Sequence, residues 1–560
     1  MNHESNPGLH HLLCSNVVPN TCEAAFFQLR IDDITSQISQ LRSRLSELED
    51  QLQLHRAVLS PVRRTPVEIL GQIFAHFLPD ILQASARDNL VEIQLVCKSW
   101  RDAARLTHKL WSALYFEDLT SVAYKKIRQW FDRAGSIPKH LAYSAVSHDA
   151  CTDQSVACGS LQSSAIATLL VSLEGTLDHL SLKYKGPKCL QNLLDSLGAA
   201  EGGPTPQLRR PWYPLKSITL EFNEQWIESP NPLQSMFHHL PPNITSFELR
   251  LPSKWSNAFE DGEDSSTAPL PLPQNLLERL SSFTLRCNWD GTQWLEAALG
   301  HCVNVETLTM DFMGSYWSYD EYHPHTERLL SSGLLLPKVR TLRLKNVFAA
   351  SIDILSALKA PQLVELDIDF DCDIEDNYEF SQPLLSFVKR SECDTTFRSF
   401  HLRHTPIRTE ELSATLRGLP FLTHLTLEDV TTDTTAGLID AFEALEDGPQ
   451  RYLPNLEALN LLQLQPDFYF RTLLNFLESH RPYRMENGKP VFTNPHNTFK
   501  QLTVTYQTTT KTNQELGRSE VQSAKLVWFN QQSGRYPEVV EVLRKWGGVS
   551  VNIGPILYAD

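Results

Sequence analysis

The sequence has no long apolar run, no paired-cysteine motif and no surplus of positive charge. No stretch of its 560 residues is apolar enough for a membrane span, and the first residues lack the pattern of a secretory signal. The 10 cysteines are scattered without zinc-finger spacing, so we expect reduced thiols in a cytoplasmic or nuclear protein. The net charge of −16 disfavours nucleic acid and membrane surfaces as partners.

Motifs that mark common enzyme classes are also missing. The sequence contains no G-x-x-x-x-G-K-[ST], G-x-G-x-x-G, H-E-x-x-H or G-x-S-x-G motif. The carboxylates of Asp367, Asp369, Asp371 and Asp373 alternate along a predicted strand and share its outward face, where a cation or a basic partner would fit. The EF-hand pattern is absent, which favours a solvated acidic stretch. We expect no catalytic residues, no metal and no cofactor.

A heptad pattern is present near the beginning of the chain. After a leader at residues 1–22 that we predict to be flexible, apolar residues recur at alternating spacings of three and four, which predicts a helix over residues 23–58. Packing of this helix on the next domain and self-association through residues 31–52 are equal alternatives. The apolar stripe consists of Ile31, Ile34, Ile38, Leu41, Leu45, Leu48 and Leu52.

A second pattern, apolar-x-x-apolar-x-apolar, recurs eleven times within residues 137–524. Its last two apolar residues lie two apart and therefore point to one side of a strand, so stacked copies would bury a continuous core. Amphipathic helical stretches lie between the copies, and the copies are 24 to 43 residues apart. They begin at Leu177, Leu215, Ile244, Leu280, Val305, Val339, Leu363, Phe397, Leu422, Leu456 and Phe499.

These copies resemble leucine-rich repeats, as in LPKVRTLRL from Leu336 and LPNLEALNL from Leu453. The resemblance implies an irregular solenoid, a right-handed α/β horseshoe, with a disordered insertion near residues 257–273 and a C-terminal cap at residues 525–560. We expect its concave strand face to bind a target protein. The outward residues that we expect there are Glu221, Glu248, Arg286, Arg343, Asp367 and Glu428.

Residues 59–116 contain three runs, PVRRTPVEILGQIF from Pro61, VCKSWRDAA from Val96 and LWSAL from Leu110. Val67, Leu70, Ile73, Phe74 and Phe77 recur at helical spacing in and beside the first run, which predicts a buried face. In order and spacing the runs resemble the F-box family, especially its expanded fungal members, although Thr65 stands where the family usually has leucine. The resemblance implies a Skp-adaptor-binding surface, and its residues, which also serve a helical core, would be Pro66, Ile69, Leu70, Ile73, Phe74, Val96 and Trp100.

The sequence therefore predicts an α/β protein in which a helical F-box module precedes a leucine-rich-repeat solenoid. The implied function is that of a substrate-recognition subunit in an SCF-type cullin ubiquitin ligase, which does no chemistry itself. Its implied partners are the Skp-type adaptor with its cullin ligase and a target protein that the sequence does not identify. The alternatives are a leucine-rich-repeat interaction scaffold without a ligase role and an enzyme with an unrecognised site.

Overall fold

The computed structural model divides the chain into two compact units. The first contains Met1–Leu78 and Asn89–Thr107, and the second contains Pro79–Asp88 and His108–Asp560. The expected insertion, apart from residues 272 and 273, and the expected C-terminal cap, apart from residues 550–555, lie outside the described residues. The structure describes residues 14–15, 17–117, 124–145, 160–173, 177–199, 212–223, 235–252, 272–287, 289, 292–315, 317, 324–371, 379–433, 438, 453–464, 483–486, 489–492, 499–506 and 550–555.

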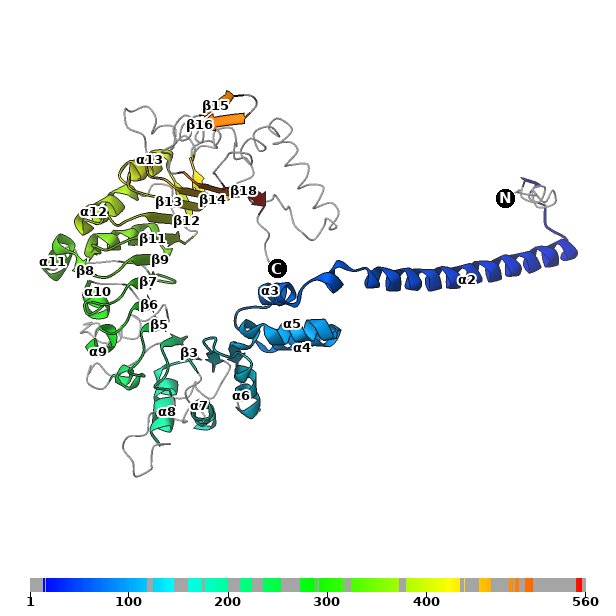
Figure 1. Ribbon diagram of the computed structural model, residues 1–560, viewed down its shortest axis with the longest axis horizontal. Helices are drawn as coiled ribbons and strands as arrows, with labels where there is room; N and C mark the ends of the chain where they lie inside the picture. Colours follow the sequence, from blue (N-terminus) through cyan, green and yellow to red (C-terminus); the bar gives the residue numbers. More distant parts are fainter. Residues whose placement is uncertain are drawn as a thin grey trace. The chain divides into compact units, whose positions relative to one another are not determined.

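The first unit is helical (Figure 1). Its longest helix, α2 (Thr21–Val58), begins with a capping box, in which the Asn20 side chain accepts from the Glu23 amide while the Glu23 carboxylate accepts from the Asn20 amide. A short 3₁₀ turn, η1 (Pro61–Arg64), leads to α3 (Val67–Phe77), and α5 (Lys98–Leu106) follows α4. Helix α4 (Ala84–Val96) has residues in both units.

Helices α3 and α5 form the core of the first unit. Leu70 and Phe74 lie one turn apart on α3 and are 3% exposed, and the Phe74 ring lies 5.1 Å from that of Trp100. Gly71 lies between them, and a Cβ atom there would come within 2.0 Å of the Thr107 hydroxyl. With Thr107 in place, the approach of the two helices leaves no room for a Cβ atom at position 71.

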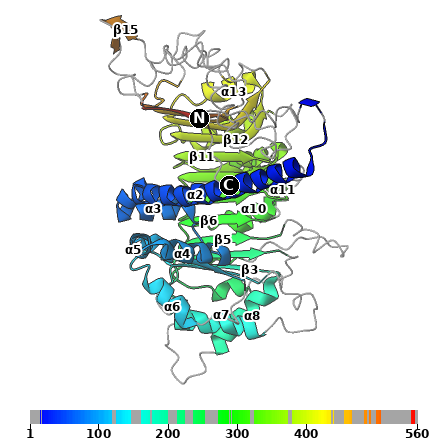
Figure 2. The same cartoon turned by 90° about the vertical axis from the view of Figure 1, so that its right-hand side faces the viewer.

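The second unit is built on one parallel sheet, which contains fourteen strands in the part of the chain that the structure describes. The strands follow chain order along an arc with the helices on its outer side (Figure 1), and in Figure 2 the strands from β3 to β12 lie one above another. They are β1 (Ala113–Phe116), β2 (His140–Ser144), β3 (His179–Tyr184), β4 (Ser217–Phe222), β5 (Ser246–Arg250), β6 (Ser282–Arg286), β7 (Thr307–Asp311), β9 (Thr341–Val347), β11 (Glu365–Phe370), β12 (Ser399–Ile407), β13 (His424–Thr432), β14 (Ala458–Leu464), β17 (Gln501–Tyr506) and β18 (Ser550–Pro555).

Helical segments of uneven length connect these strands, which makes the repeat irregular. Two short strands, β8 (Leu334–Leu335) and β10 (Leu358–Lys359), pair beside the sheet, and β15 (Tyr483–Glu486) and β16 (Lys489–Phe492) form an antiparallel hairpin. The 3₁₀ turn η2 (His108–Trp111) precedes β1. The connecting helices are α6 (Tyr124–Asp132), α7 (Ser160–Ser172), α8 (Pro187–Ala199), η5 (Met236–His239), α9 (Gln274–Leu277), α10 (Thr292–Leu299), α11 (Pro324–Ser332), η7 (Ala349–Ala357), α12 (Ser381–Ser391) and α13 (Thr409–Arg417).

The core of the second unit is a ladder of inward side chains from successive strands. Leu342, Leu366 and Phe400 occupy one rung of the register, and Leu344, Ile368 and Leu402 occupy the next. All six side chains are fully buried. The predicted alternation is confirmed, and the architecture is that of a leucine-rich-repeat horseshoe in which each strand buries its inner face against its neighbours.

Candidate functional site

The first unit exposes apolar side chains along one line of helix α3. Ile69, Ile73 and Phe77 lie four residues apart, so they share one helix face, and they are 44%, 52% and 68% exposed. The sequence predicted that Ile73 and Phe77 would lie on a buried face, and for both residues this was wrong. Leu70 and Phe74 occupy the line that faces α5, and one small helix covers too narrow an arc to bury both lines.

Further exposed apolar side chains lie on the other two short helices of this unit. Leu95 and Val96 on α4 are 71% and 60% exposed, and Leu106 on α5 is 65% exposed. Together with Val91 and the line on α3, we call these residues the exposed apolar set. These residues are the candidate protein-contact surface of the first unit.

The expected adaptor-binding residues divide between the surface and the interior. Pro66, Ile69, Ile73 and Val96 are exposed and Trp100 is half-buried, so these side chains are available to a partner. Leu70 and Phe74 are buried and support the surface from inside. Sequence reasoning did not include Phe77, Val91, Leu95 and Leu106 in this surface. The four-residue step from Ile73 was the signal for Phe77.

On the sheet, the strand face opposite the helices carries two charged clusters. The first cluster lies on β3 to β6, where the Glu221 carboxylate is 2.8 Å from Lys183 Nζ, 3.5 Å from Arg250 and 3.6 Å from Arg286. Arg250 also binds Glu248 at 2.6 Å. Burial raises the pKa of Glu221, but the bond from Lys183 and the three positive charges outweigh it, so the pKa lies below its ordinary value.

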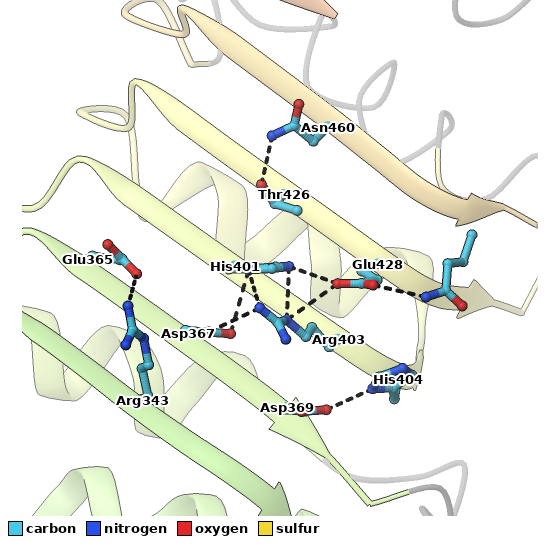
Figure 3. Close-up of polar contacts among 11 residues, drawn as sticks. Arg343, Glu365, Asp367, Asp369, His401, Arg403, His404, Thr426, Glu428 and Asn460 are labelled. Carbon is cyan, nitrogen blue, oxygen red and sulfur yellow. Dashed lines mark hydrogen bonds and ion pairs between the residues drawn. The ribbon is translucent and has the colours of Figure 1, made fainter. Parts of the chain in front are cut away.

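The second cluster lies on β11 to β13 and surrounds His401 (Figure 3). The His401 ring lies 3.6 Å from Asp367 Oδ1 and 3.3 Å from Glu428 Oε2, and Arg403 reaches the same two carboxylates at 3.3 Å and 3.4 Å. His404 Nδ1 lies 2.7 Å from Asp369 Oδ1 at the edge of the cluster. Burial raises the pKa of Asp367 and lowers that of His401, so burial works against the charged form of each group.

Asp367 keeps one acceptor unused within this second cluster. The residue is 8% exposed, and its Oδ2 accepts from Arg403, whereas Oδ1 has no hydrogen-bond donor in the described structure. A buried carboxylate oxygen without a donor is costly, which agrees with the raised pKa of Asp367.

The structure thus brings the six expected target-binding residues to one face but divides them between neighbourhoods. Glu221, Glu248 and Arg286 lie in or beside the first cluster, and Asp367 and Glu428 lie in the second. Arg343 lies beside the second cluster and is paired with Glu365 at 3.4 Å. Of the acidic stretch, Asp367 and Asp369 face His401 and His404 from β11, and Asp373 lies outside the described residues.

Two histidines on β2 and β3 form a third polar feature of this face. The rings of His140 and His179 lie 4.0 Å apart, and both contact the Ser181 hydroxyl, at 2.8 and 3.1 Å. Thr219 joins His179 to Glu248 through contacts of 3.3 and 3.1 Å. Burial, with a smaller contribution from His179, lowers the pKa of His140 to about 3, so His140 is neutral near pH 7.

Two absences can be stated for the described part of the chain. It contains no group of three or more His, Cys, Asp or Glu side chains arranged to hold a metal ion. None of its helices combines the length and the apolar character that a membrane crossing requires.

Comparison with protein families gives a match to the model described as F-box-like, at residues 64–117. Residues 64–117 are an F-box-like domain. A leucine-rich-repeat-like region follows this domain, as the parallel sheet shows. The F-box-like domain thus contains α3, α5 and the whole exposed apolar set, together with α4, η2 and β1.

Two solved structures resemble the chain distantly. One is the crystal structure of the Rad7 and Elc1 complex in yeast, with 13% identity and a TM-score of 0.30, covering 80% of this chain and 94% of the other. The second is the leucine-rich-repeat-containing protein LegL7 from Legionella pneumophila, with 15% identity, a TM-score of 0.27 and coverage of 57% and 83%. TM-scores this low support no argument. Comparison with curated proteins gave no match.

Proposed function

We propose that this protein is the substrate-recognition subunit of an SCF-type cullin ubiquitin ligase. The observation that carries the proposal is an F-box-like domain at residues 64–117 followed by a leucine-rich-repeat-like sheet. The protein performs no chemistry itself in this role and acts in the cytoplasm or nucleus. It holds a target protein near the ubiquitin that the ligase transfers.

The adaptor contact uses the exposed apolar set of the F-box-like domain. Ile69, Ile73 and Phe77 form a line one helix face wide, which suits docking of a helix into an apolar groove. Exposed apolar anchors of this kind contribute most of the binding energy of an interface when a partner covers them. Pro66, at the N-cap of α3, and Val96 and Trp100 extend the surface.

The target contact uses the strand face of the leucine-rich-repeat-like region. The first cluster supplies Glu221, Glu248 and Arg286 to this contact. The second cluster supplies Asp367 and Glu428, and Arg343 lies beside it. Their charges largely neutralise one another in the free protein, so a target must replace ion pairs with complementary ones, which gives specificity.

Co-purification with a Skp-type adaptor tests the proposal. The wild type is compared with the Ile73→Asp, Phe77→Asp double variant, which places charge in the exposed line, and with Gln72→Asp, His76→Asp on another exposed face of the same helix. Circular dichroism checks that all three proteins are folded. We expect the wild type and the control to retain the adaptor and the Ile73, Phe77 variant to lose it.

A wild type that is folded and still retains no adaptor would contradict the ligase role. The protein would then be a leucine-rich-repeat scaffold, and Thr65, in place of the usual leucine, would be the first position to restore in a gain-of-binding variant, Thr65→Leu.

A further inference from the structure

Helix α2 carries an exposed apolar seam. It has 38 residues, which span about 57 Å at 1.5 Å per residue, and although the structure describes all of them, none is buried. The seam side chains are between 44% and 69% exposed. They are Ile31, Ile34, Ile38, Leu41, Leu45, Leu48 and Leu52.

The period of the seam indicates the kind of partner that covers it. Its residues keep a repeat of 3.5 over three heptads, whereas a helix that packs on a globular domain shows a wider stripe. A strict seven-residue repeat fits a left-handed supercoil with another helix of the same repeat. A second copy of this chain offers such a helix.

Charges beside the seam fit two copies in parallel and in register. In that arrangement Arg44 of one helix faces Glu49 of the other, and none of the flanking pairs joins like charges. Arg44 also contacts Glu47 of its own helix at 2.6 Å, and its five N–H donors allow both contacts. The other flanking pairs are Arg30 with Thr35, Gln37 with Arg42 and Gln51 with Arg56.

We propose that α2 forms a parallel, two-stranded coiled coil with α2 of a second copy. In the middle heptad, Ile38 and Leu41 place a β-branched residue and a leucine at alternating seam positions, the combination that favours two strands, whereas the first heptad has Ile31 with Ile34 and the third has Leu45 with Leu48. The dimer carries two F-box-like domains and two strand faces, so a target with two recognition sites binds with avidity. The pairing itself does not depend on adaptor binding.

Light scattering with size-exclusion chromatography on the full chain measures the stoichiometry. We expect a dimer for the wild type and a monomer for Leu45→Gln, Leu48→Gln, because glutamine retains helix propensity but removes two seam positions. The matched control is Leu29→Gln, Leu54→Gln, which removes two leucines that are 71% and 68% exposed and lie off the seam. This control should remain a dimer.

A monomeric wild type, a stoichiometry other than two, or a dimer that survives the seam substitutions would overturn the proposal. Adaptor binding is measured on the same proteins. If they retain the Skp-type adaptor, the failure concerns the pairing of α2 and not the ligase role. Circular dichroism confirms that the variants remain helical.

A disulfide assay tests the orientation. Leu41→Cys is introduced into a chain in which Cys14, Cys22 and Cys97, the exposed cysteines among the described residues, are serine. In a parallel, in-register pair the two new thiols meet, so mild oxidation should give a covalent dimer on a non-reducing gel. A dimer in solution that yields no covalent product would contradict the parallel arrangement.

Discussion

The helices of the F-box-like domain and the strand face of the leucine-rich-repeat-like region expose opposite kinds of surface. On the helices, Ile73 and Phe77 are 52% and 68% exposed although both are apolar. On the strand face, Glu221, Asp367 and Glu428 are charged, and their side chains are 17%, 11% and 21% exposed. The helices therefore expose apolar side chains that proteins usually bury, and the strand face partly buries charged side chains that proteins usually expose.

Because they differ in this way, the two surfaces suit different partners. An apolar line gains free energy when almost any complementary groove covers it, which suits an adaptor that many receptors share. A face of mutually paired charges gains little from burial and rejects partners that leave a charge unpaired, which suits a selected target. If the charged face bound the adaptor and the apolar line bound the target, variants of each surface would reveal it.

The largest effect is expected from the contrast between Phe74 and Phe77. Phe74→Ala removes a buried ring and should lower the free energy of unfolding by about 3–5 kcal/mol. Phe77→Ala removes an exposed ring and should change stability by less than about 0.5 kcal/mol. It should weaken adaptor binding by about 2 kcal/mol. Denaturant titration measures stability, and calorimetry measures adaptor binding. Equal losses of stability in the two variants would contradict the assignment of Phe74 to the core and Phe77 to the surface.

A smaller effect is expected where α3 and α5 meet. Gly71→Ala brings a Cβ atom against the Thr107 hydroxyl and should destabilise the domain by about 1–3 kcal/mol. In a Thr107→Ala background the same change should be neutral or stabilising by up to about 1 kcal/mol, because alanine favours helix. A double-mutant cycle on thermal unfolding gives the coupling. Additive effects would show that the two residues do not limit the approach of the helices.

The strand face should respond to acid through His140. Its pKa in the folded protein is about 3 against an ordinary 6.5, so between these values the folded state binds fewer protons than the unfolded chain. Stability therefore falls as pH falls from 6.5 towards 3, and His140→Gln should flatten that fall. The exposed His424 on β13 provides the control variant His424→Gln. If stability depends on pH identically in the wild type and in His140→Gln, His140 does not contribute to the loss of stability in acid.

The smallest effect is expected from salt on the adaptor complex. Screening weakens ionic contacts but leaves apolar burial intact, so adaptor affinity should change by less than about threefold between roughly 0.05 and 0.5 M salt. Target binding, once a target is known, should weaken by more than this. Calorimetric titration at several salt concentrations measures both responses. An adaptor affinity that falls steeply with salt would show that charges, and not Ile73 and Phe77, dominate the contact.

The sequence predicted the strands well because a strand needs only a period of two. Each of the eleven motif copies coincides with a strand of the sheet. The strand β1 carries the same motif at Trp111, Leu114 and Phe116, but we had assigned that run to the helical module. In β2, Pro138 occupies the first position of the motif, so a motif search could not find that strand.

The sites were less predictable because they depend on which neighbours meet. Helical spacing places Leu70, Ile73 and Phe77 near one another, but only the position of α5 decides which of them is buried. The bond between Arg403 and Asp367 joins residues 36 apart in the chain, and it follows from the register of β11 with β12. The charge types were evident from the sequence, whereas the pairings required the structure.

Hydrogen–deuterium exchange of the full chain with and without a Skp-type adaptor tests the central division of surfaces most directly. The account predicts that the adaptor slows exchange in α3 (Val67–Phe77), in residues 91–96 of α4 and in α5 (Lys98–Leu106). Exchange in strands β3 to β14 should remain unchanged. Slowing confined to the strands, with the helices unaffected, would contradict the account.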